Sequence, residues 1–184
     1  MKFLNANDVC CFSPHPDDCE YSISGTVKKY FDTKFHIFNF SSGGKFSSAK
    51  QASERISEVK SFWSEFENVR MNFFNNKFIR DIETDEYILK LDKIFSNKFY
   101  NFILIPPSND THQDHRKINE IANSIVRSSK VGLIEYMTPS TKVNWSSNFF
   151  VDISNEVDFK KKLLFSSFKT QSKKPYFTDE VFNA

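Results

Sequence analysis

Short apolar runs alternate along the chain with longer segments in which apolar residues recur every three or four positions. The short runs are typical of strands buried in a parallel sheet, and the longer segments are typical of amphipathic helices. The predicted strands span residues 9–12, 34–40, 69–74, 99–105, 131–137 and 149–153. The predicted helices span residues 20–31, 48–66, 84–95, 112–127 and 156–168. The pattern therefore predicts an α/β fold, a Rossmann-like three-layer sandwich with a mostly parallel sheet and helices on both faces.

Composition is that of one globular unit. The chain has 184 residues, of which 39% are hydrophobic, and we expect a single domain over residues 1–184. It contains 22 phenylalanines, so aromatic rings should supply much of the core volume. The formal net charge is only +2, which gives no general case for binding nucleic acid or a membrane surface. Two lysine clusters, at 160–162 and 173–174, are predicted to be solvated; the alternative is that they attract a phosphorylated substrate.

The first residues of the chain and its cysteines indicate the compartment. Residues 1–8 lack a long apolar core behind a basic start, so we expect no secretory signal. No apolar run approaches the roughly 20 residues of a spanning helix, and we expect a cytoplasmic protein with no membrane span. Cys10, Cys11 and Cys19 are an odd number within one strand and its turn, which is not a disulfide framework. Cys19 could ligate a metal, but we expect it to pack into the helix.

Metal-ligand side chains follow two of the predicted strands. His15, Asp17 and Asp18 lie directly after the first strand. His112 and His115 lie after the fourth strand, in the segment Asp110-Thr111-His112-Gln113-Asp114-His115. In an open α/β sheet, ligands bind at the carboxyl ends of the strands. Because three of the four histidines fall in these two turns, the sequence predicts one site built from both.

The residue types in the two turns are those of a catalytic zinc site. Such a site typically uses three protein ligands and leaves a fourth position for water. His15, Asp18 and one histidine of the second turn would supply that set. His112 and His115 are three residues apart near a helix start and therefore share a face. Zinc lowers the pKa of its bound water to about 7, and a nearby carboxylate can then take the proton. Asp17 is suitably placed for that role.

Each of these residues, taken alone, also has a simpler interpretation. Asp17 or Asp18 would more often be the N-cap of the following helix, and Asp110 and Thr111 are natural caps for theirs. A lone His115 would more often be a surface residue of a helix. However, two polar clusters that each directly follow a buried strand are hard to assign to capping alone. Their joint occurrence favours a functional site.

The two turns resemble the signatures of a known family. His15-Pro16-Asp17-Asp18 matches a His-Pro-Asp-Asp turn, and His112-Gln113-Asp114-His115 matches a later His-x-Asp-His. This ordered pair within an α/β pattern is similar to the PIG-L/LmbE family of metal-dependent N-acetylglucosamine deacetylases. The resemblance extends from about Val9 to Phe182. Residues 171–177 look like the branch found with surface-glycan and amino-sugar biosynthesis.

The resemblance implies a role for each matching residue. The ligands of zinc, with iron as an alternative metal, would be His15, Asp18 and His115. Asp17 would be the general base that activates water and then passes the proton to the leaving amine. His112 would stabilise the tetrahedral oxyanion, and Asp114 would steady the charge or orientation of His112. Arg55, in the long second helix, would contact sugar hydroxyls.

The chain also departs from the family pattern in the region of the substrate. Asn75 and Asn76 stand where many members have an aspartate that contacts the sugar. The branch usually continues past the position of Phe182, and the chain, ending at Ala184, is expected to lack that C-terminal segment. Because the segment helps to wall the pocket in relatives, substrate choice is left open, whereas the metal site should be intact. The loop Ser41-Ser42-Gly43-Gly44-Lys45 could border the substrate.

We therefore expect a zinc-dependent N-deacetylase. It would remove the acetyl group from an N-acetylated amino sugar, an N-acetylglucosamine-type conjugate or sugar nucleotide, by metal-activated water. The partner would be this sugar, with no nucleic acid, and homo-oligomerisation is left open. One alternative is a metal-binding relative without turnover or completed by a partner chain; intact Asp17 and His112 disfavour it. Another is an iron(II) oxygenase with a facial triad, which the repeated helix periods disfavour because such enzymes usually have all-β folds.

Overall fold

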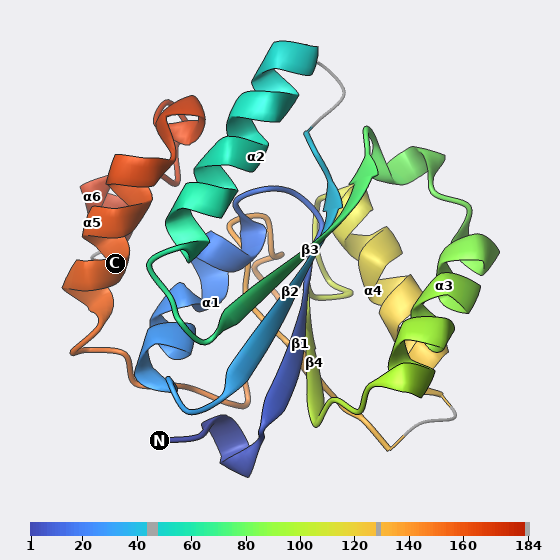
Figure 1. Ribbon diagram of the computed structural model, residues 1–184. Coiled ribbons are helices and arrows are strands. Elements are labelled where there is room, and N and C mark those ends of the chain that lie inside the picture. The colour runs from blue at the N-terminus through green and yellow to red at the C-terminus, as the bar shows by residue number, and fades with distance from the viewer. Residues whose placement is uncertain (44–47, 128–129, 183–184) are drawn as a thin grey trace.

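The computed structural model describes residues 1–43, 48–127 and 130–182 (Figure 1). Within these ranges the strands are β1 (Asp8–Ser13), β2 (Lys34–Ser41), β3 (Val69–Asn76), β4 (Phe102–Ile105) and β5 (Gly132–Glu135). The α-helices are α1 (Asp18–Lys29), α2 (Ala49–Trp63), α3 (Thr84–Asn97), α4 (Gln113–Val126), α5 (Val157–Ser167) and α6 (Asp179–Phe182). Short 3-10 turns cover Phe3–Asn5, Ile79–Asp81 and Lys169–Gln171.

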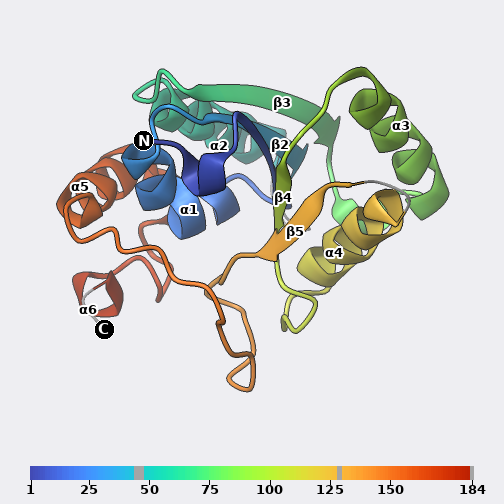
Figure 2. The same cartoon turned by 90° about the horizontal axis from the view of Figure 1, so that it is seen from below.

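The five strands form one parallel sheet in the order β3-β2-β1-β4-β5. Helices α1, α2 and α5 cover one face of the sheet, and α3 and α4 cover the other (Figure 1, Figure 2). The molecule is therefore a three-layer sandwich with a doubly wound sheet. The α/β fold predicted from the alternating pattern is confirmed.

Side chains on the two faces of the sheet form separate apolar cores. Along β1, Val9 and Cys11 enter the core under α1 and α2, whereas Cys10 and Phe12 enter the core under α3 and α4. This division follows from the strand geometry, since successive side chains point to opposite faces. The largest fully buried side chains include six phenylalanines, Phe3, Phe12, Phe35, Phe40, Phe62 and Phe168. Aromatic rings thus supply much of the core, as the composition predicted.

The direction of chain progression reverses between β1 and β4. The chain moves from β1 outward to β2 and β3, and then returns to the other side of β1 to form β4 and β5. The carboxyl ends of β1 and β4 lie side by side, with Cys11 opposite Leu104. In doubly wound sheets a ligand crevice forms outside the strand ends at this switch point. Both polar turns identified in the sequence follow these two strands.

Residues 149–153 do not form the strand that their alternating apolar pattern predicted. They run outside the sheet along the α1 layer (Figure 2). A Cβ added at Gly25 of α1 would lie 2.6 Å from Ile153 Cδ1, so this glycine leaves the space that Ile153 fills. The Phe149 ring packs against Phe3, with centroids 6.1 Å apart. A segment that packs against a helix layer can therefore show the same alternation of apolar and polar residues as a strand. Because residues 149–153 stay outside the sheet, β5 is its edge strand.

The third strand is longer than predicted. A turn was expected at residues 75–77, but β3 continues through Asn76, which pairs with Ser41 of β2. The Asn76 side-chain amide donates to the Phe40 carbonyl over 2.8 Å, which ties the end of β3 to β2. Asn76 thus extends β3, because its side-chain amide hydrogen-bonds to a backbone carbonyl of the neighbouring strand.

One lysine that was expected to be solvated is buried. Lys160 on α5 is only 9% exposed, and its ammonium group lies 5.6 Å from the centroid of the Tyr21 ring. Burial lowers the pKa of Lys160 to about 8. Cys19, in contrast, lies where we expected it. Its thiol is fully buried in the core under α1 and α2, which confirms a packing role.

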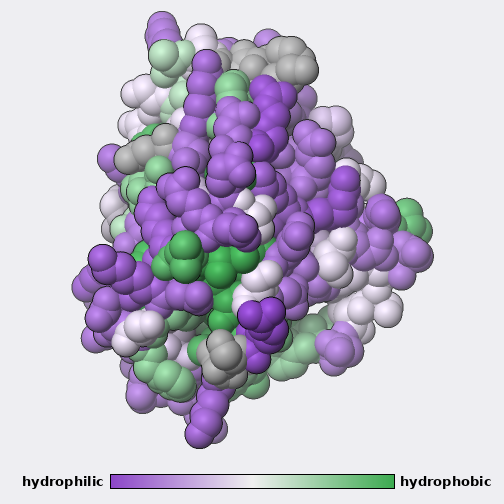
Figure 3. Space-filling view, turned by 90° about the vertical axis from the view of Figure 1, so that its right-hand side faces the viewer, coloured by the Kyte–Doolittle hydropathy of each residue, from purple (hydrophilic) through white to green (hydrophobic). Residues whose placement is uncertain are grey.

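The face covered by α3 and α4 is mostly hydrophilic, with a group of apolar side chains near its centre (Figure 3). None of the helices in the described ranges is long and apolar enough to cross a membrane. Gly44 and Lys45 of the glycine-containing loop lie outside the described residues. The contact of that loop with a substrate stays a prediction.

Candidate active site

The turn after β1 is held in shape by its own polar groups. The Ser13 hydroxyl donates to the His15 carbonyl over 2.7 Å, and the backbone N–H of His15 donates to Asp18 Oδ2 over 2.7 Å. Asp17 has a φ angle of 150°, which residues other than glycine rarely adopt. Its carboxylate makes no capping hydrogen bond to α1. Capping therefore does not explain Asp17, and its unusual backbone belongs to a turn that also lines a cavity.

The turn after β4 is organised around Asp110, which is fully buried. Its Oδ1 accepts the backbone N–H of His112 over 2.7 Å, as a cap would. Its Oδ2 also accepts from His115 Nδ1 over 2.9 Å and from the Thr138 hydroxyl over 2.6 Å. Burial opposes ionisation, but these hydrogen bonds hold the pKa of Asp110 well below its usual range. From the sequence, Asp110 was expected only to cap the helix. The one local sign that it also orients a histidine is its position five residues before His115.

Three imidazoles and one carboxylate converge where the two turns meet. One ligand atom from each of His15, His112 and His115 lies within 4.8 Å of the others. The Asp18 carboxylate lies between two of these rings, with Oδ2 3.3 Å from His15 Nδ1 and Oδ1 3.3 Å from His115 Nε2. His15 and His115 are buried, whereas His112 is exposed. The structure thus brings together His15, Asp18 and His115, and adds His112 to the donors near them.

Asp114, which was expected to steady the charge or orientation of His112, also contacts a second imidazole. Its carboxylate Oδ2 lies 3.0 Å from His15 Nε2. The backbone N–H of Asp114 donates to His112 Nδ1 over 3.2 Å. Asp114 therefore orients both rings, one through its side chain and the other through its backbone.

Arg55 and Gln171 hold the Asp17 carboxylate from two sides. Arg55 Nη2 donates to Asp17 Oδ1 over 2.9 Å and to the Pro16 carbonyl over 3.0 Å. When the Gln171 amide is assigned to the orientation that satisfies both of its ends, its nitrogen lies 3.2 Å from Asp17 Oδ2 and its oxygen lies 3.1 Å from Arg55 Nε. This orientation gives the carboxylate a donor and the guanidinium an acceptor. Arg55, expected at a sugar hydroxyl, thus contacts the carboxylate that was predicted to be the base.

Gln171 reaches this place because the C-terminal segment folds back onto α2. The backbone N–H of Thr170 donates to Glu58 Oε1 on α2 over 2.9 Å, which anchors the 3-10 turn that carries Gln171. Gln171 is itself buried, at 5% exposure. Sequence reasoning noticed residues 171–177 only through the resemblance, because no local pattern indicates a contact with a turn near the start of the chain.

The electrostatics of the cluster favour a cation. Burial raises the pKa of Asp17, although the charge of Arg55 opposes this shift. Burial also works against protonation of His115, but the charge of Asp18 and the hydrogen bond to Asp110 raise the pKa of His115 to about 10. These carboxylates therefore stabilise positive charge at the imidazoles. A divalent ion bound by neutral imidazoles would satisfy the same carboxylates, and this set of nitrogen and oxygen donors suits zinc or iron.

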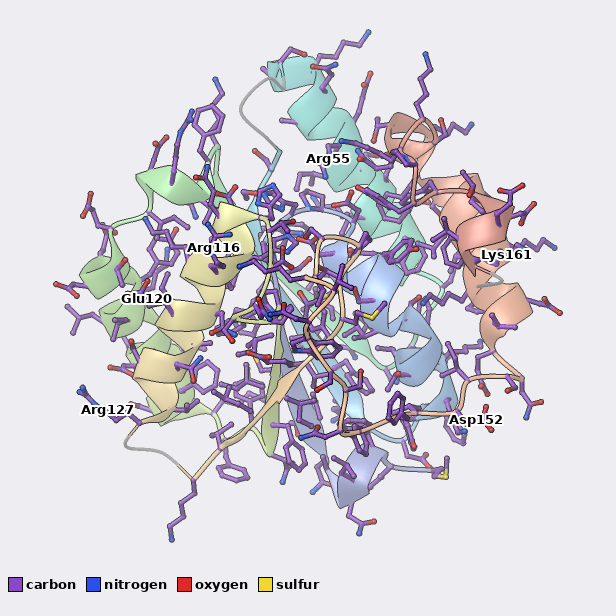
Figure 4. All side chains as sticks on the ribbon, turned by 180° about the vertical axis from the view of Figure 1, so that it is seen from behind. Arg55, Arg116, Glu120, Arg127, Asp152 and Lys161 are labelled. Atoms are coloured by element: carbon purple, nitrogen blue, oxygen red, sulfur yellow. The ribbon has the colours of Figure 1, made fainter. Side chains whose placement is uncertain are left out.

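A cavity of about 290 Å³ lies over the cluster. Its walls come from both turns, from α2 through Arg55, from residues 139–140, and from the C-terminal segment through Gln171, Lys174 and Tyr176. Figure 4 shows Arg55 on α2 and Arg116 on α4, the helices on the two sides of the site. The Arg116 guanidinium donates to the Asp110 carbonyl over 2.8 Å and so steadies the second turn. Lys174 thus belongs to a site and not only to a solvated loop.

The fold and the site together define an α/β protein with histidines and carboxylates clustered at the switch point of a doubly wound sheet. The chain belongs to the PIG-L family. The sequence model of that family, described as GlcNAc-PI de-N-acetylase, matches residues 10–126. This range contains both turns and Arg55. No curated protein sequence matches the chain.

Solved structures with the same fold include two deacetylases and an enzyme of another class. N,N'-diacetylchitobiose deacetylase from Pyrococcus horikoshii is 20% identical, with a TM-score of 0.75 over 98% of this chain and 74% of that one. A zinc-inhibited form of teicoplanin deacetylase is 11% identical, with a TM-score of 0.68 over 96% of this chain and 89% of that one. A 4-carboxy-2-hydroxymuconate hydratase from Pseudomonas putida is 14% identical, with a TM-score of 0.69 over 100% and 83%. These similarities establish the fold.

Proposed function

We propose that the protein is a metal-dependent hydrolase that removes the acetyl group from an N-acetylated amino sugar, an N-acetylglucosamine-type conjugate or sugar nucleotide. The observation that carries this proposal is the placement of the oriented Asp17 carboxylate beside His15, Asp18 and His115 in one cavity. Membership of the PIG-L family and the deacetylases of similar fold support the reaction class. The fold alone would not, because a hydratase shares it.

His15, Asp18 and His115 would hold the metal, which is zinc or iron. His15 Nε2 is engaged by Asp114 and His115 Nδ1 by Asp110, so His15 Nδ1 and His115 Nε2 are the nitrogens left for an ion. Both of these nitrogens lie 3.3 Å from Asp18. Carboxylate partners of this kind fix the ring orientation of metal-binding histidines. A bound divalent metal lowers the pKa of a water ligand to about 7 and polarises a carbonyl oxygen.

Asp17 would act as the base. It takes a proton from the water that adds to the acetamide carbonyl, and it returns that proton to the amine nitrogen as the C–N bond breaks. The products are acetate and the free amino sugar. Arg55 and Gln171 fix the position of the carboxylate, and each of its oxygens retains capacity to accept another hydrogen bond. Burial raises the pKa of Asp17, which makes it a stronger base than an exposed aspartate.

His112 would donate a hydrogen bond to the oxyanion that forms at the acetamide carbonyl. Its Nδ1 accepts the backbone N–H of Asp114, so the proton of the neutral ring resides on Nε2. Burial and the neighbouring His15 and His115 lower the pKa of His112, which favours this neutral form. The ring lines the cavity, where Nε2–H can meet a substrate oxygen.

The reaction is tested by measuring free amine and acetate from the metal-loaded protein with N-acetylglucosamine, a UDP-linked N-acetylglucosamine and an N-acetylglucosamine glycoside. We expect both products in equal amounts from at least one of these substrates. Asp81→Asn, which alters an exposed carboxylate in the Ile79–Asp81 turn, is a matched control that should retain the wild-type rate. Absence of amine from all three substrates at full metal loading would contradict the proposal.

A further inference from the structure

A second groove lies beside the catalytic cavity. It has a volume of about 590 Å³ and shares Tyr21, Pro139 and Tyr176 with the wall of that cavity. Ligand sites in proteins usually measure about 300–1,000 Å³. The catalytic cavity alone, at about 290 Å³, is at the lower limit of that range. A substrate larger than one sugar ring would therefore continue into the groove.

The groove is lined mainly by apolar and aromatic side chains. Met137 is 63% exposed and Val143 is 103% exposed, and both border it. Val181 borders it as well at 45% exposure, and the rings of Trp145 and Tyr176 complete its apolar lining. Exposed apolar side chains are normal when scattered, but their concentration beside a catalytic cavity marks a binding surface.

The walls of the groove are fixed before any ligand binds. The Tyr176 ring meets the Tyr21 ring edge to face, with centroids 5.6 Å apart, which holds the C-terminal wall against α1. On the opposite wall, Trp145 Nε1 donates to Glu135 Oε2 over 3.2 Å. The backbone N–H of Lys142 donates to the Asn109 carbonyl over 3.0 Å, which ties this wall to the turn that carries the histidines. A preformed groove can contribute binding energy without a large ordering cost.

The charge of the groove selects between kinds of substrate. Among the described residues that line it, the one charged side chain is Lys142. This lysine is exposed, so it is a weak site for the two phosphates of a sugar nucleotide. Apart from Thr138 and Thr141, the surface that remains is apolar or aromatic, and it shares three wall residues with the cavity in which the acetamido group would react.

We propose that this groove binds an apolar aglycone, an aryl or alkyl group joined to the N-acetylated sugar. The inference rests on the proposed function and narrows its substrate class from conjugates and sugar nucleotides to apolar glycosides. Burial of several methylene groups favours binding strongly enough to change affinity by at least ~10-fold. The gain should be seen mainly in KM, because the aglycone lies away from the reacting carbonyl.

The test compares kcat/KM of the metal-loaded protein for an octyl 2-acetamido glycoside, free N-acetylglucosamine and UDP-linked N-acetylglucosamine. We expect the octyl glycoside to exceed the free sugar by at least ~10-fold. Met137→Asp and Val143→Asp place a charge in the groove at exposed positions and should reduce this ratio several-fold. Leu89→Asp, at a 70% exposed position on α3, is the matched control and should leave the ratio unchanged. Equal kcat/KM values, or a preference for the UDP-linked sugar, would overturn the inference.

A binding measurement separates this inference from the proposed function. Calorimetric titration of metal-loaded Asp17→Asn with the octyl glycoside and with the free sugar reports the groove without turnover. A preference of about 10-fold for the octyl glycoside, reduced in Val143→Asp, upholds the groove even if no amine is ever formed. Equal affinities would overturn the groove even if the protein is a deacetylase.

Discussion

Arg55 Nη2 lies 2.9 Å from Asp17 Oδ1, and the two side chains are only 12% and 8% exposed. This buried ion pair joins the middle of α2 to the turn after β1. It has opposite effects on the two properties that a base needs. The contact fixes the direction of the carboxylate, but the charge of Arg55 lowers the pKa of Asp17 against the larger effect of burial. The ion pair therefore makes Asp17 a somewhat weaker base but holds its carboxylate in a fixed direction.

Replacing Asp17 should separate metal binding from turnover. Asp17→Asn removes the base but keeps the shape of the side chain, so the rate of amine release should fall about 10²–10⁴-fold. Metal content, measured by elemental analysis, should stay at the wild-type value. His115→Ala removes a proposed ligand and should lose the metal as well as the activity. Wild-type activity in Asp17→Asn would show that another group takes the proton.

The position of Gln171 predicts an effect on kcat. Gln171→Ala removes a hydrogen bond to a charged carboxylate, and we expect kcat to fall by ~10-fold with little change in KM or metal content. Gln171→Glu would place a second carboxylate beside Asp17 and should be worse than alanine. Lys173→Ala, at an exposed position close by, is the control. Equal kcat values in the two Gln171 variants and the wild type would show that Gln171 does not position the Asp17 carboxylate.

Asp110 should control metal affinity through His115. Asp110→Ala leaves His115 Nδ1 without its carboxylate partner, and losses of this kind weaken metal binding by about 10–100-fold. Competition with a chromogenic chelator would measure the change. Asp114→Ala tests the corresponding contact to His15. Unchanged zinc affinity in Asp110→Ala would mean that His115 does not bind the metal through Nε2.

Lys160 predicts a specific dependence of stability on pH. Its pKa is lowered from 10.5 to about 8 by burial, so the unfolded chain binds more protons between these two pH values. Stability therefore rises with pH across this window. Lys160→Met should lack that rise. Between pH 7 and pH 10.5, the free energy of unfolding of the wild type should therefore increase by roughly 3 kcal/mol relative to that of Lys160→Met.

Chemical denaturation of both proteins at pH 7.5 and pH 10 would measure this difference. Lys162→Met changes an exposed lysine of the same helix and should follow the wild type at both pH values. Parallel pH dependences of Lys160→Met and the wild type would show that Lys160 is charged and solvated in the folded protein.

The parts of the structure that follow from local sequence were predictable. The strands from β1 to β5 and the two polar turns are each encoded within a few consecutive residues, so periodicity and residue type locate them. The convergence of His15 with His115 also follows, because adjacent parallel strands end at the same edge. The family resemblance then supplied roles that geometry alone leaves open.

The parts that depend on distant contacts could not be predicted. Residues 149–153 alternate like a strand, but their partner is Gly25 on a helix far away in sequence. Lys160 belongs to a run of three lysines, and only the tertiary packing decides that it is the buried one. Gln171 meets Asp17 because the C-terminal segment returns to α2, an arrangement with no local signature.

The measurement that tests the central claim most directly is a titration of metal-free protein with Zn²⁺, and with Fe²⁺ under anaerobic conditions, while amine release from an N-acetylglucosamine glycoside is followed. The site predicts no activity in the presence of chelator and a rise to a plateau near one equivalent of metal per chain. Full activity without metal would contradict the role of His15, Asp18 and His115. No activity at any metal content, with metal shown to be bound, would contradict the deacetylase itself.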